Sequence, residues 1–493
     1  MTETNSRASA PSVEVPRRAW QALIVLLLGM FMALLDTTIV NVALPTIETS
    51  LDASEATLSW IISGYALAFG LALIPAGKVG DRIGHKWVFF TGLALFTLAS
   101  LACGLAQNDI QLVLARVVQG LAGGIFVPAV TAFIQLLFPG PVRGKAFAIM
   151  GAVIGVSTAL GPIVGGLIIE AFGEADGWRG VFFVNLPIGV VALIAAALLL
   201  PQRVDSGQPR QSGIDWVGLA LITAGLVALL VPLIEGQDQG WPTWTYVSLV
   251  GGVVLIAVFG AWEVSYTKRG LNPLVPPKLF THPAFTGGTI LALVYFAAFT
   301  SIFFTLSLLW QTGLGNSALA SGIVTVPFAI GSIIASSQSN KLTQRLGRGV
   351  LLLGTSFVAV ALIWLWILLA TVDAADLSGW MLLPPLLIGG LGNGAFIAPN
   401  AQFIVATVDP QDAGAGSGVI QTMQRVGSAA GIAVIGSVLF GSLHITGPDT
   451  VASGFMHAAA VAMGVSAAFG VLALLLVFAL PKRVDSRRAP AGG

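Results

Sequence analysis

The chain has 493 residues, of which 56% are hydrophobic and only 9% are charged. Soluble domains carry about 25% charged residues, so this composition excludes a soluble globular protein and predicts a chain that crosses a membrane many times. The net charge of +1 says nothing about partners, although no nucleic-acid partner is expected. A single cysteine, Cys103, excludes an internal disulfide and a cysteine-based metal site.

Fourteen apolar stretches are long enough to cross a bilayer, which takes about 20 helical residues. A polar segment precedes the first of them, and a second polar segment follows the last. We therefore predict an all-α membrane protein with two flexible, solvent-exposed ends. The expected spans are residues 20–45, 57–76, 87–106, 111–137, 146–172, 181–200, 215–234, 245–266, 284–310, 318–338, 349–371, 380–405, 415–440 and 455–480.

The positions of lysine and arginine predict the orientation of these spans. With the N-terminus in the cytoplasm and the spans alternating, all but three of the 23 Lys and Arg residues fall on the cytoplasmic side, where positive charges gather. Arg179 falls outside, and Arg116 and Arg425 lie within spans. We therefore expect both termini in the cytoplasm, in a multi-pass protein of the cell (inner) membrane.

An internal repeat divides the chain. Residues 120–126 match residues 390–396 at an offset of 270, and residues 81–84 match 344–347 at an offset of about 263. Two six-helix halves would repeat after about 200 residues, so the surplus places two extra helices between them. The expected division is a tail at 1–19, a six-helix bundle at 20–200, an inserted helix pair with inner loops at 201–280, a six-helix bundle at 281–480 and a tail at 481–493.

The first span contains an acid, Asp36. A carboxylate near the bilayer centre costs roughly 2.5–3.5 kcal/mol on insertion scales, so it marks a functional site. Asp36 lies about 24 Å above the start of span 1, and Arg116 of span 4 lies about 8 Å below the outer surface. In a core of about 30 Å these depths nearly coincide. We expect Asp36 to interact with Arg116, directly or through water or Gln119; alternatively, Arg116 extends outward to the surface.

Two glycine-rich segments accompany this pair. The loop after span 2 contains Gly77, Asp81, Arg82, Gly84 and Lys86. Its glycines permit a tight turn and its charges offer contacts, although it could be an ordinary positively charged inner loop. Small residues recur in span 5, where they would form a flat face for close helix packing; its members include Gly151, Gly155, Gly161, Pro162, Gly165 and Gly166.

At this point the chain resembles the major facilitator superfamily. The loop after span 2 is similar to its most widespread signature, with a mild departure at Val79 and Gly80. Gln344 replaces the acid in the second copy, which implies an asymmetric latch. The segment around Arg116 resembles a motif associated with proton coupling, and the segment around Gly161 resembles one that is characteristic of antiporters. Residues 35–45 and 178–187 resemble marks of the fourteen-span drug:proton antiporters.

The resemblance implies a major facilitator fold of two six-helix bundles plus two inserted helices. It implies an antiporter that exports amphipathic or cationic drugs and other toxic compounds in exchange for protons by alternating access. The alternatives are a dedicated exporter of a lipid, a siderophore or a self-made antibiotic, or a proton-coupled importer, which the span-5 motif disfavours. We expect Asp36 and Arg116 to couple protons, and we expect substrate to meet polar side chains from both halves, namely Asn41, Gln119, Tyr295, Asn393, Asn400 and Gln421.

No enzyme signature occurs in the sequence. A phosphate-binding Gly-x-x-x-x-Gly-Lys-Ser/Thr loop is absent, and the four histidines are scattered. We therefore expect no cofactor and no metal, with protons as the coupling ion, a small-molecule substrate, the lipid bilayer as surroundings, and a monomer. The second half has no clearly buried acid; Glu235 and Glu263, at the ends of the inserted helices, are the nearest candidates, and an interfacial role is expected for both.

Overall fold

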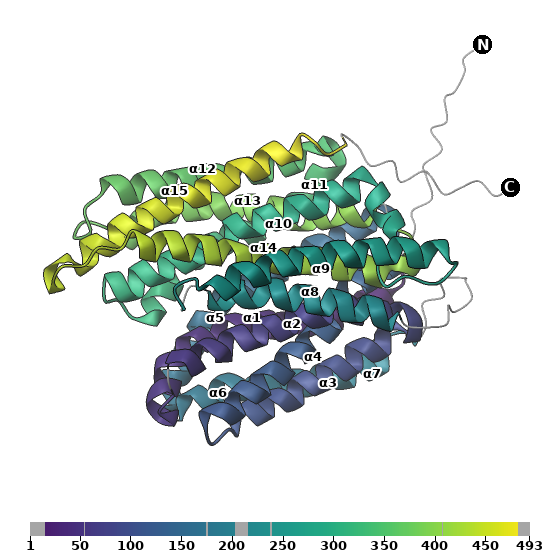
Figure 1. The fold of residues 1–493 in the computed structure, drawn as a ribbon, viewed down its shortest axis with the longest axis horizontal. Coiled ribbons are helices and arrows are strands. Elements are labelled where there is room, and N and C mark those ends of the chain that lie inside the picture. The colour runs from purple at the N-terminus through teal and green to yellow at the C-terminus, as the bar shows by residue number, and fades with distance from the viewer. Residues whose placement is uncertain are drawn as a thin grey trace, which may run out of the picture.

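The computed structural model describes residues 15–53, 55–173, 176–202, 215–236, 239–406 and 408–481. Within this part the chain forms long helices that run side by side, and no strand occurs there (Figure 1). The helices are α1 (Arg17–Leu51), α2 (Glu55–Ile83), α3 (His85–Gly104), α4 (Asp109–Leu137), α5 (Gly140–Phe172), α6 (Gly177–Phe183), α7 (Asn185–Leu199), α8 (Trp216–Glu235), α9 (Thr243–Lys268), α10 (Pro283–Leu308), α11 (Ala318–Leu346), α12 (Gly349–Thr371), α13 (Gly379–Val405), α14 (Ala413–Gly441) and α15 (Val451–Val477).

The all-α membrane architecture is confirmed. Thirteen helical stretches of the described chain are long and apolar enough to cross a membrane, and α6 and α7 together make one of them. The remaining expected span corresponds to α5, a continuous helix of 33 residues. The thirteen stretches and α5 are therefore consistent with fourteen spans. The terminal tails expected at 1–19 and 481–493 lie almost wholly outside the described residues.

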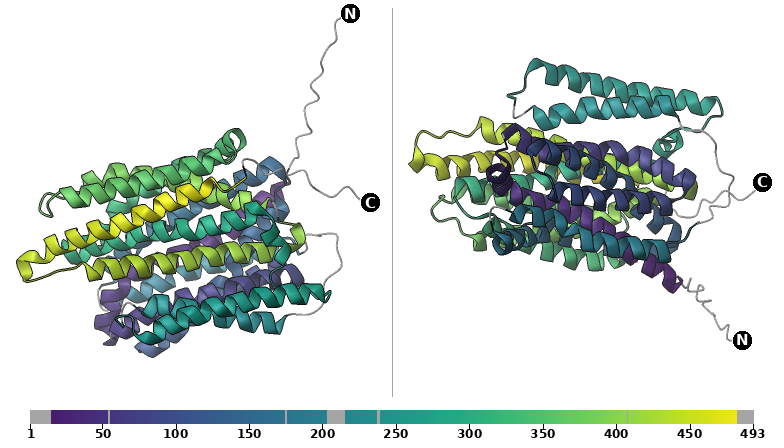
Figure 2. Two further views of the ribbon diagram at one scale, coloured as in Figure 1. Left: turned by 45° about the horizontal axis from the view of Figure 1, so that its top comes forward. Right: turned by 90° about the horizontal axis from the view of Figure 1, so that it is seen from below.

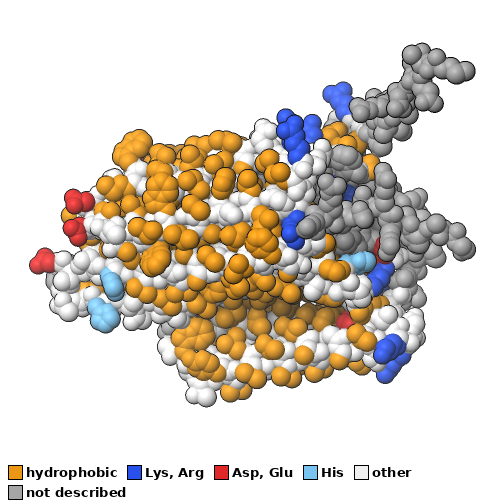
Figure 3. Space-filling model, turned by 90° about the horizontal axis from the view of Figure 1, so that it is seen from above, with side chains coloured by type: hydrophobic (Ala, Val, Ile, Leu, Met, Phe, Trp, Pro, Cys, Tyr) orange, Lys and Arg blue, Asp and Glu red, His pale blue; other side chains and the backbone are white. Residues whose placement is uncertain are grey.

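The outer surface of the bundle matches a lipid environment. Apolar side chains cover its flank, and Lys and Arg gather toward one end, whereas the opposite end shows Asp and Glu without Lys or Arg (Figure 3). Leu198 and Trp380 are among the large apolar side chains that point outward, at 78% and 81% exposure. We call the two ends the basic end and the acidic end. In a bilayer, lipid tails and not water contact this apolar flank, so outward-facing apolar side chains carry no hydration cost there.

The sequence repeat corresponds to a repeated helix contact. Gly120 of α4 lies against the backbone of Tyr65 in α2, and Gly390 of α13 lies against the backbone of Phe328 in α11. One turn further on, Gly124 meets Phe69 and Gly394 meets Ser332 in the same way. A Cβ at any of these four glycines would collide with main chain, so glycine is what lets each helix pair approach so closely.

The inserted helices form a layer of their own. Figure 2 shows the α8–α9 pair alongside the rest of the bundle. Helix α8 packs against both α2 and α14; on the α2 side, Leu230 fills the space beside Gly70. The insert therefore contacts one helix from each side of the internal repeat. The boundaries expected at 200 and 281 stay predictions.

Candidate functional site

The expected pair of Asp36 and Arg116 is in direct contact. Arg116 Nη1 donates to Asp36 Oδ2 at 2.6 Å, and both side chains are almost completely buried, Asp36 at 0% and Arg116 at 1% exposure. The other carboxylate oxygen, Oδ1, accepts from Gln119 Nε2 and from Asn185 Nδ2, each at 2.9 Å. Both oxygens of Asp36 thus act as acceptors, the role of an ionised carboxylate. Arg116 does not extend outward to the surface.

Arg116 is held on every side. Its Nε donates to the Ile61 carbonyl at 3.0 Å, and Nη1 also donates to Gln119 Oε1 at 2.6 Å. The ring of Tyr65 covers the guanidinium, with the carbon Cζ 4.0 Å from the ring centroid. Tyr65 in turn donates through its hydroxyl to the Ala33 carbonyl at 3.3 Å. These contacts replace the water that a charged guanidinium would otherwise need.

Two members of this cluster were not among the site residues predicted from the sequence. Asn185 begins α7 and donates to Asp36, and Ser100 of α3 accepts from Gln119 Nε2 at 2.7 Å and from Asn185 Nδ2 at 3.3 Å. Asn185 belongs to the Phe-Val-Asn-Leu-Pro segment, whose resemblance to a family motif could have pointed to this residue. Nothing in the sequence pointed to Ser100. The site therefore joins side chains of α1, α3, α4 and α7.

The span-5 glycines bring α5 against the segment that follows Asp36. A Cβ at Gly161 would collide with the Thr38 side chain, and a Cβ at Gly165 would lie 3.0 Å from Ile39 Cγ1 and 3.1 Å from the Ile39 carbonyl. Nearer the basic end of α5, a Cβ at Gly155 would lie 2.9 Å from Ser332 Oγ of α11. Helix α5 thus packs tightly on α1 and on α11. Pro162 lies in the same helix.

Asp81 joins α2 to the start of α14 at the basic end. Its Oδ1 accepts from the Gly414 amide at 2.7 Å and its Oδ2 from the Ala415 amide at 3.0 Å. These amides are among the unpaired donors of a helix N-terminus, where a negative charge is favoured. Gly77 lies against Gly414, and a side chain at either position would prevent this approach. Gln344 instead bonds to Asn340 within α11 at 3.5 Å, so the expected asymmetry between the two copies is present.

The remaining residues of this loop have separate surroundings. Lys86 Nζ donates to the Ala197 and Leu200 carbonyls at 2.8 Å each, which caps the end of α7. Gly84 has a φ of +102°, a backbone conformation that favours glycine. Arg82 is exposed.

A second contact joins the inserted pair to the second bundle at the basic end. Lys278, in the 3₁₀ turn Pro277–Thr281, lies 2.9 Å from Asp409 Oδ2 and 2.8 Å from Asp412 Oδ2. Burial alone would lower the pKa of Lys278, but its hydrogen bonds to Asp412 and Asp409 raise the pKa above its ordinary value. The ammonium therefore stays charged throughout the neutral range, and the contact persists there.

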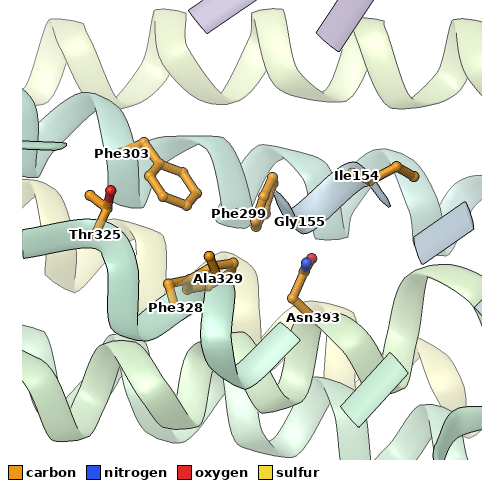
Figure 4. Close-up of a pocket in the computed structure, with 8 residues that line it drawn as sticks. All are labelled: Ile154, Gly155, Phe299, Phe303, Thr325, Phe328, Ala329 and Asn393. Carbon is orange, nitrogen blue, oxygen red and sulfur yellow. The ribbon is translucent and has the colours of Figure 1, made fainter. Parts of the chain in front are cut away.

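A cavity lined by aromatic side chains lies at the contact between α5 and the second bundle. It is narrow, with room for about one water molecule, and Ile154 and Gly155 close it on the α5 side (Figure 4). The remaining lining comes from Phe299 and Phe303 of α10, from Asn393 of α13, and from Thr325, Phe328 and Ala329 of α11. The three phenylalanine rings make this lining mainly apolar.

The polar residues predicted to bind substrate are dispersed. Asn393 borders the cavity, but its amide is already bonded: Tyr295 Oη donates to Asn393 Oδ1 at 2.9 Å, and Nδ2 donates to Ser332 Oγ at 3.0 Å. Gln119 belongs to the Asp36 cluster and is 0% exposed. Asn400 Nδ2 donates to the Gly288 carbonyl at 3.2 Å.

Two other residues predicted to bind substrate are at least partly exposed. Asn41 is exposed near the acidic end of α1, and Gln421 of α14 is half-buried. Glu263, near the basic end of α9, is buried and accepts from the Val275 amide at 3.0 Å. Among the described residues no group of three or more His, Cys, Asp or Glu side chains could hold a metal.

Comparison with known proteins gives one consistent family. The family model of the Major Facilitator Superfamily matches residues 26–432. A probable actinorhodin transporter of Streptomyces coelicolor is 35% identical over 429 residues, which cover 86% of this chain and 73% of that protein. The cephamycin export protein CmcT of Amycolatopsis lactamdurans is 33% identical, with 91% and 90% covered, and the puromycin resistance protein pur8 of Streptomyces alboniger is 33% identical, with 97% and 93% covered.

Solved structures share the fold at low sequence identity. The proton:xylose symporter XylE superposes with a TM-score of 0.64 at 13% identity, covering 94% of this chain and 96% of that one. Human MFSD10 (TETRAN) gives a TM-score of 0.62 at 16% identity, with 94% and 100% covered. These likenesses concern the arrangement of helices alone.

Proposed function

This chain belongs to the Major Facilitator Superfamily, and from that premise we propose that it is a proton-coupled antiporter that exports amphipathic small molecules across the inner membrane. It is a multi-pass membrane transporter and not an enzyme. Its relatives include exporters and resistance proteins for antibiotics, which supports export as the direction of transport. The observation on which the coupling rests is the buried cluster around Asp36.

Asp36 and Arg116 form the proposed proton site. Arg116, Gln119 and Asn185 surround the carboxylate and leave it no exposed surface. A proton that binds Asp36 removes the negative charge and turns one oxygen into a donor. The Arg116 contact is then weakened, because Arg116 can only donate. Protonation therefore exchanges one set of helix contacts for another at the point where α1 and α4 meet.

The glycines of α5 connect a movement of α1 to the second bundle. Gly161 and Gly165 of α5 pack against the α1 segment that follows Asp36, and Gly155 of α5 packs against α11. A displacement of α1 is therefore passed to a helix that also touches the second half. Asp81 holds the two halves together at the basic end, which we assign to the cytoplasm. In this arrangement the conformation is one with its cytoplasmic end closed.

The aromatic cavity is the proposed site for the apolar part of the substrate. Phe299, Phe303 and Phe328 supply flat apolar surface, and the neighbouring Asn393 amide is occupied by Tyr295 and Ser332. Apolar contact has no fixed direction, so compounds of different shape bind there in this proposal once the bundles separate and widen the narrow space. The antibiotic-export relatives also favour one narrower alternative, a dedicated exporter of a self-made antibiotic. A broad panel of substrates with similar affinities would distinguish a drug exporter from that alternative.

The test is proton exchange in vesicles. The purified protein is reconstituted with a pH-sensitive dye in the lumen, and an inward or outward pH gradient is imposed in turn. We expect protons and substrate to move in opposite directions, and transport to stop when an uncoupler removes the gradient. Movement in the same direction would identify an importer, and transport that ignores the gradient would contradict coupling.

A further inference from the structure

Arg425 is a second arginine within the membrane-spanning part of the chain. It lies 12 residues into α14, about 18 Å along the helix axis, and so near the middle of a 29-residue helix. Its guanidinium lies over the ring of Phe69, with Cζ 4.1 Å from the centroid. Phe69 lies near the middle of α2, which is also 29 residues long. Arg425 thus projects from the second bundle toward the first, halfway between the two ends.

The surroundings of Arg425 differ from those of Arg116. Arg116 has a carboxylate, an amide and a backbone carbonyl within hydrogen-bond distance. In the described part of the chain, no ion pair and no hydrogen bond reaches the Arg425 side chain, and its guanidinium lies against the face of the Phe69 ring. An arginine at this depth is costly unless it is paired or faces a polar cavity. The two arginines within spans therefore differ: Arg116 is paired with a carboxylate, whereas Arg425 has no charged partner among the described residues.

Polar side chains continue along the same face of α14. Gln421 lies one turn before Arg425 and Ser428 lies about one turn after it, at the spacing of i, i+4 and i+7 that places residues on one face of a helix. All three are half-buried. Thr422, beside Gln421, has a buried hydroxyl with no hydrogen-bond partner among the described residues. A polar strip on a helix that faces the other bundle provides donors for a ligand between the bundles.

This strip lies close to the Asp36 cluster. Tyr65, which covers Arg116, and Phe69, which Arg425 covers, are one turn apart on α2, and their ring centroids are 5.9 Å apart. Carboxylates that could attract a cation are scarce in the same region: the carboxylate of Asp36 is buried and accepts from Arg116, Gln119 and Asn185. The charge available to a substrate at this level is thus positive.

We propose that Arg425 is an anion-binding subsite, and that the exported substrate is an amphipathic organic acid whose carboxylate pairs with this guanidinium. The planar fork of the guanidinium can donate two parallel hydrogen bonds to a carboxylate. Gln421 and Ser428 add donors on either side. The proposal rests on the proposed function, since it names the substrate class of that transporter. It replaces the cationic compounds expected from the sequence with acids.

The experiment compares two ligands of the same size and shape, one charged and one neutral. Anthracene-9-carboxylic acid and anthracene-9-carboxamide share a flat fluorescent body, and the acid is ionised at neutral pH. Their binding to the purified full-length protein is measured by fluorescence titration. We expect wild type to prefer the acid by about tenfold or more, because hydrogen bonds to charged groups are among the stronger ones. Arg425→Gln should lose that preference while amide affinity stays unchanged, and Arg425→Lys should keep part of it.

Lys341→Gln is the matched control, because it removes one exposed positive charge from the end of α11 and should leave both affinities as in wild type. A wild-type protein without preference for the acid would overturn the proposal, and that arm needs no variant to fold. Equal loss of acid and amide in Arg425→Gln would overturn it as well. The fluorescence titration of ligand binding involves no proton gradient, so it tests the anion subsite separately from proton coupling. A protein that prefers the acid but exchanges no protons in vesicles would contradict the coupling and support the anion subsite.

Discussion

Arg116 Nη1 and Asp36 Oδ2 are 2.6 Å apart, although 80 residues separate them in the chain. Both belong to apolar helices, and neither side chain reaches solvent. Each therefore stabilises the other within the span: removing either partner would leave a buried charge without compensation. The same ion pair provides a group that can bind a proton and a partner that responds to it.

Asp36→Asn should abolish proton-driven export while substrate binding persists. Asparagine keeps the size of the side chain but cannot bind and release the proton. The measurement is substrate-dependent pH change inside proteoliposomes, with binding measured separately in detergent. Asp376→Asn, at an exposed position of the acidic end, is the control. Proton flux at the wild-type level in Asp36→Asn would rule out Asp36 as the carrier.

Arg116→Ala should lower stability by about 3–5 kcal/mol, the usual cost of removing one partner of a buried pair. In the double variant Asp36→Asn/Arg116→Ala the loss should be smaller than the sum of the single losses, because the two residues share one interaction. Unfolding of the purified variants in detergent gives these free energies. Additive losses would mean that the pair contributes little beyond its separate neighbours.

Gly165→Leu should impair transport and leave membrane insertion intact. A Cβ there would already lie 3.0 Å from Ile39 Cγ1, so leucine would push α5 away from α1. Gly251→Leu in α9 is the matched control, because a Cβ at Gly251 meets no atom within 4 Å. Export rate per inserted protein is the measurement. Equal rates in the two variants would show that close α1–α5 packing is not needed for transport.

Asp81→Asn should increase the population that is open at the basic end. The neutral amide keeps one acceptor oxygen, so one of the bonds to Gly414 and Ala415 is lost together with the charge at the helix N-terminus. A loss of about 1 kcal/mol changes the ratio of two states about fivefold. Distances between spin labels at Ile83 and Leu346, both exposed at this end, report that ratio.

Gln344→Ala is the control for the contact of Asp81 with Gly414 and Ala415. Gln344 bonds within its own helix, so this substitution should leave the distance distribution unchanged. Identical distributions in wild type and Asp81→Asn would reduce Asp81 to a local cap. The comparison also tests the asymmetry of the repeat, since Gln344 stands where the first copy has the acid.

Cysteine labelling tests the orientation. In a Cys103→Ala background, single cysteines at 239–242, between α8 and α9, should react with an impermeant reagent from outside the cell. Cysteines at 204–212, outside the described residues, should react only after the membrane is opened, because the basic loops are expected to face the cytoplasm. The opposite pattern would reverse the assignment of the two ends.

The sequence alone determined the membrane class, the approximate spans, and the repeat. These follow from hydropathy and spacing, which are properties of neighbouring residues. The contact between Asp36 and Arg116 was also within reach, because depth along a helix follows from residue number at a fixed rise. The family follows in the same way from local motifs, which the comparisons confirmed.

Only the tertiary structure decided which partners complete the site. Asn185 and Ser100 reach the Asp36 cluster from α7 and α3, and Gln119 was expected to bind substrate but lies buried among them. The tertiary structure also decided the surroundings of Arg425: its side chain lies over the Phe69 ring and not beside a carboxylate. The physical reason is that depth follows from counting residues, whereas the direction in which a side chain points depends on how each helix is rotated against its neighbours. That rotation is set by close contacts such as those of Gly120 and Gly390, between segments far apart in the chain.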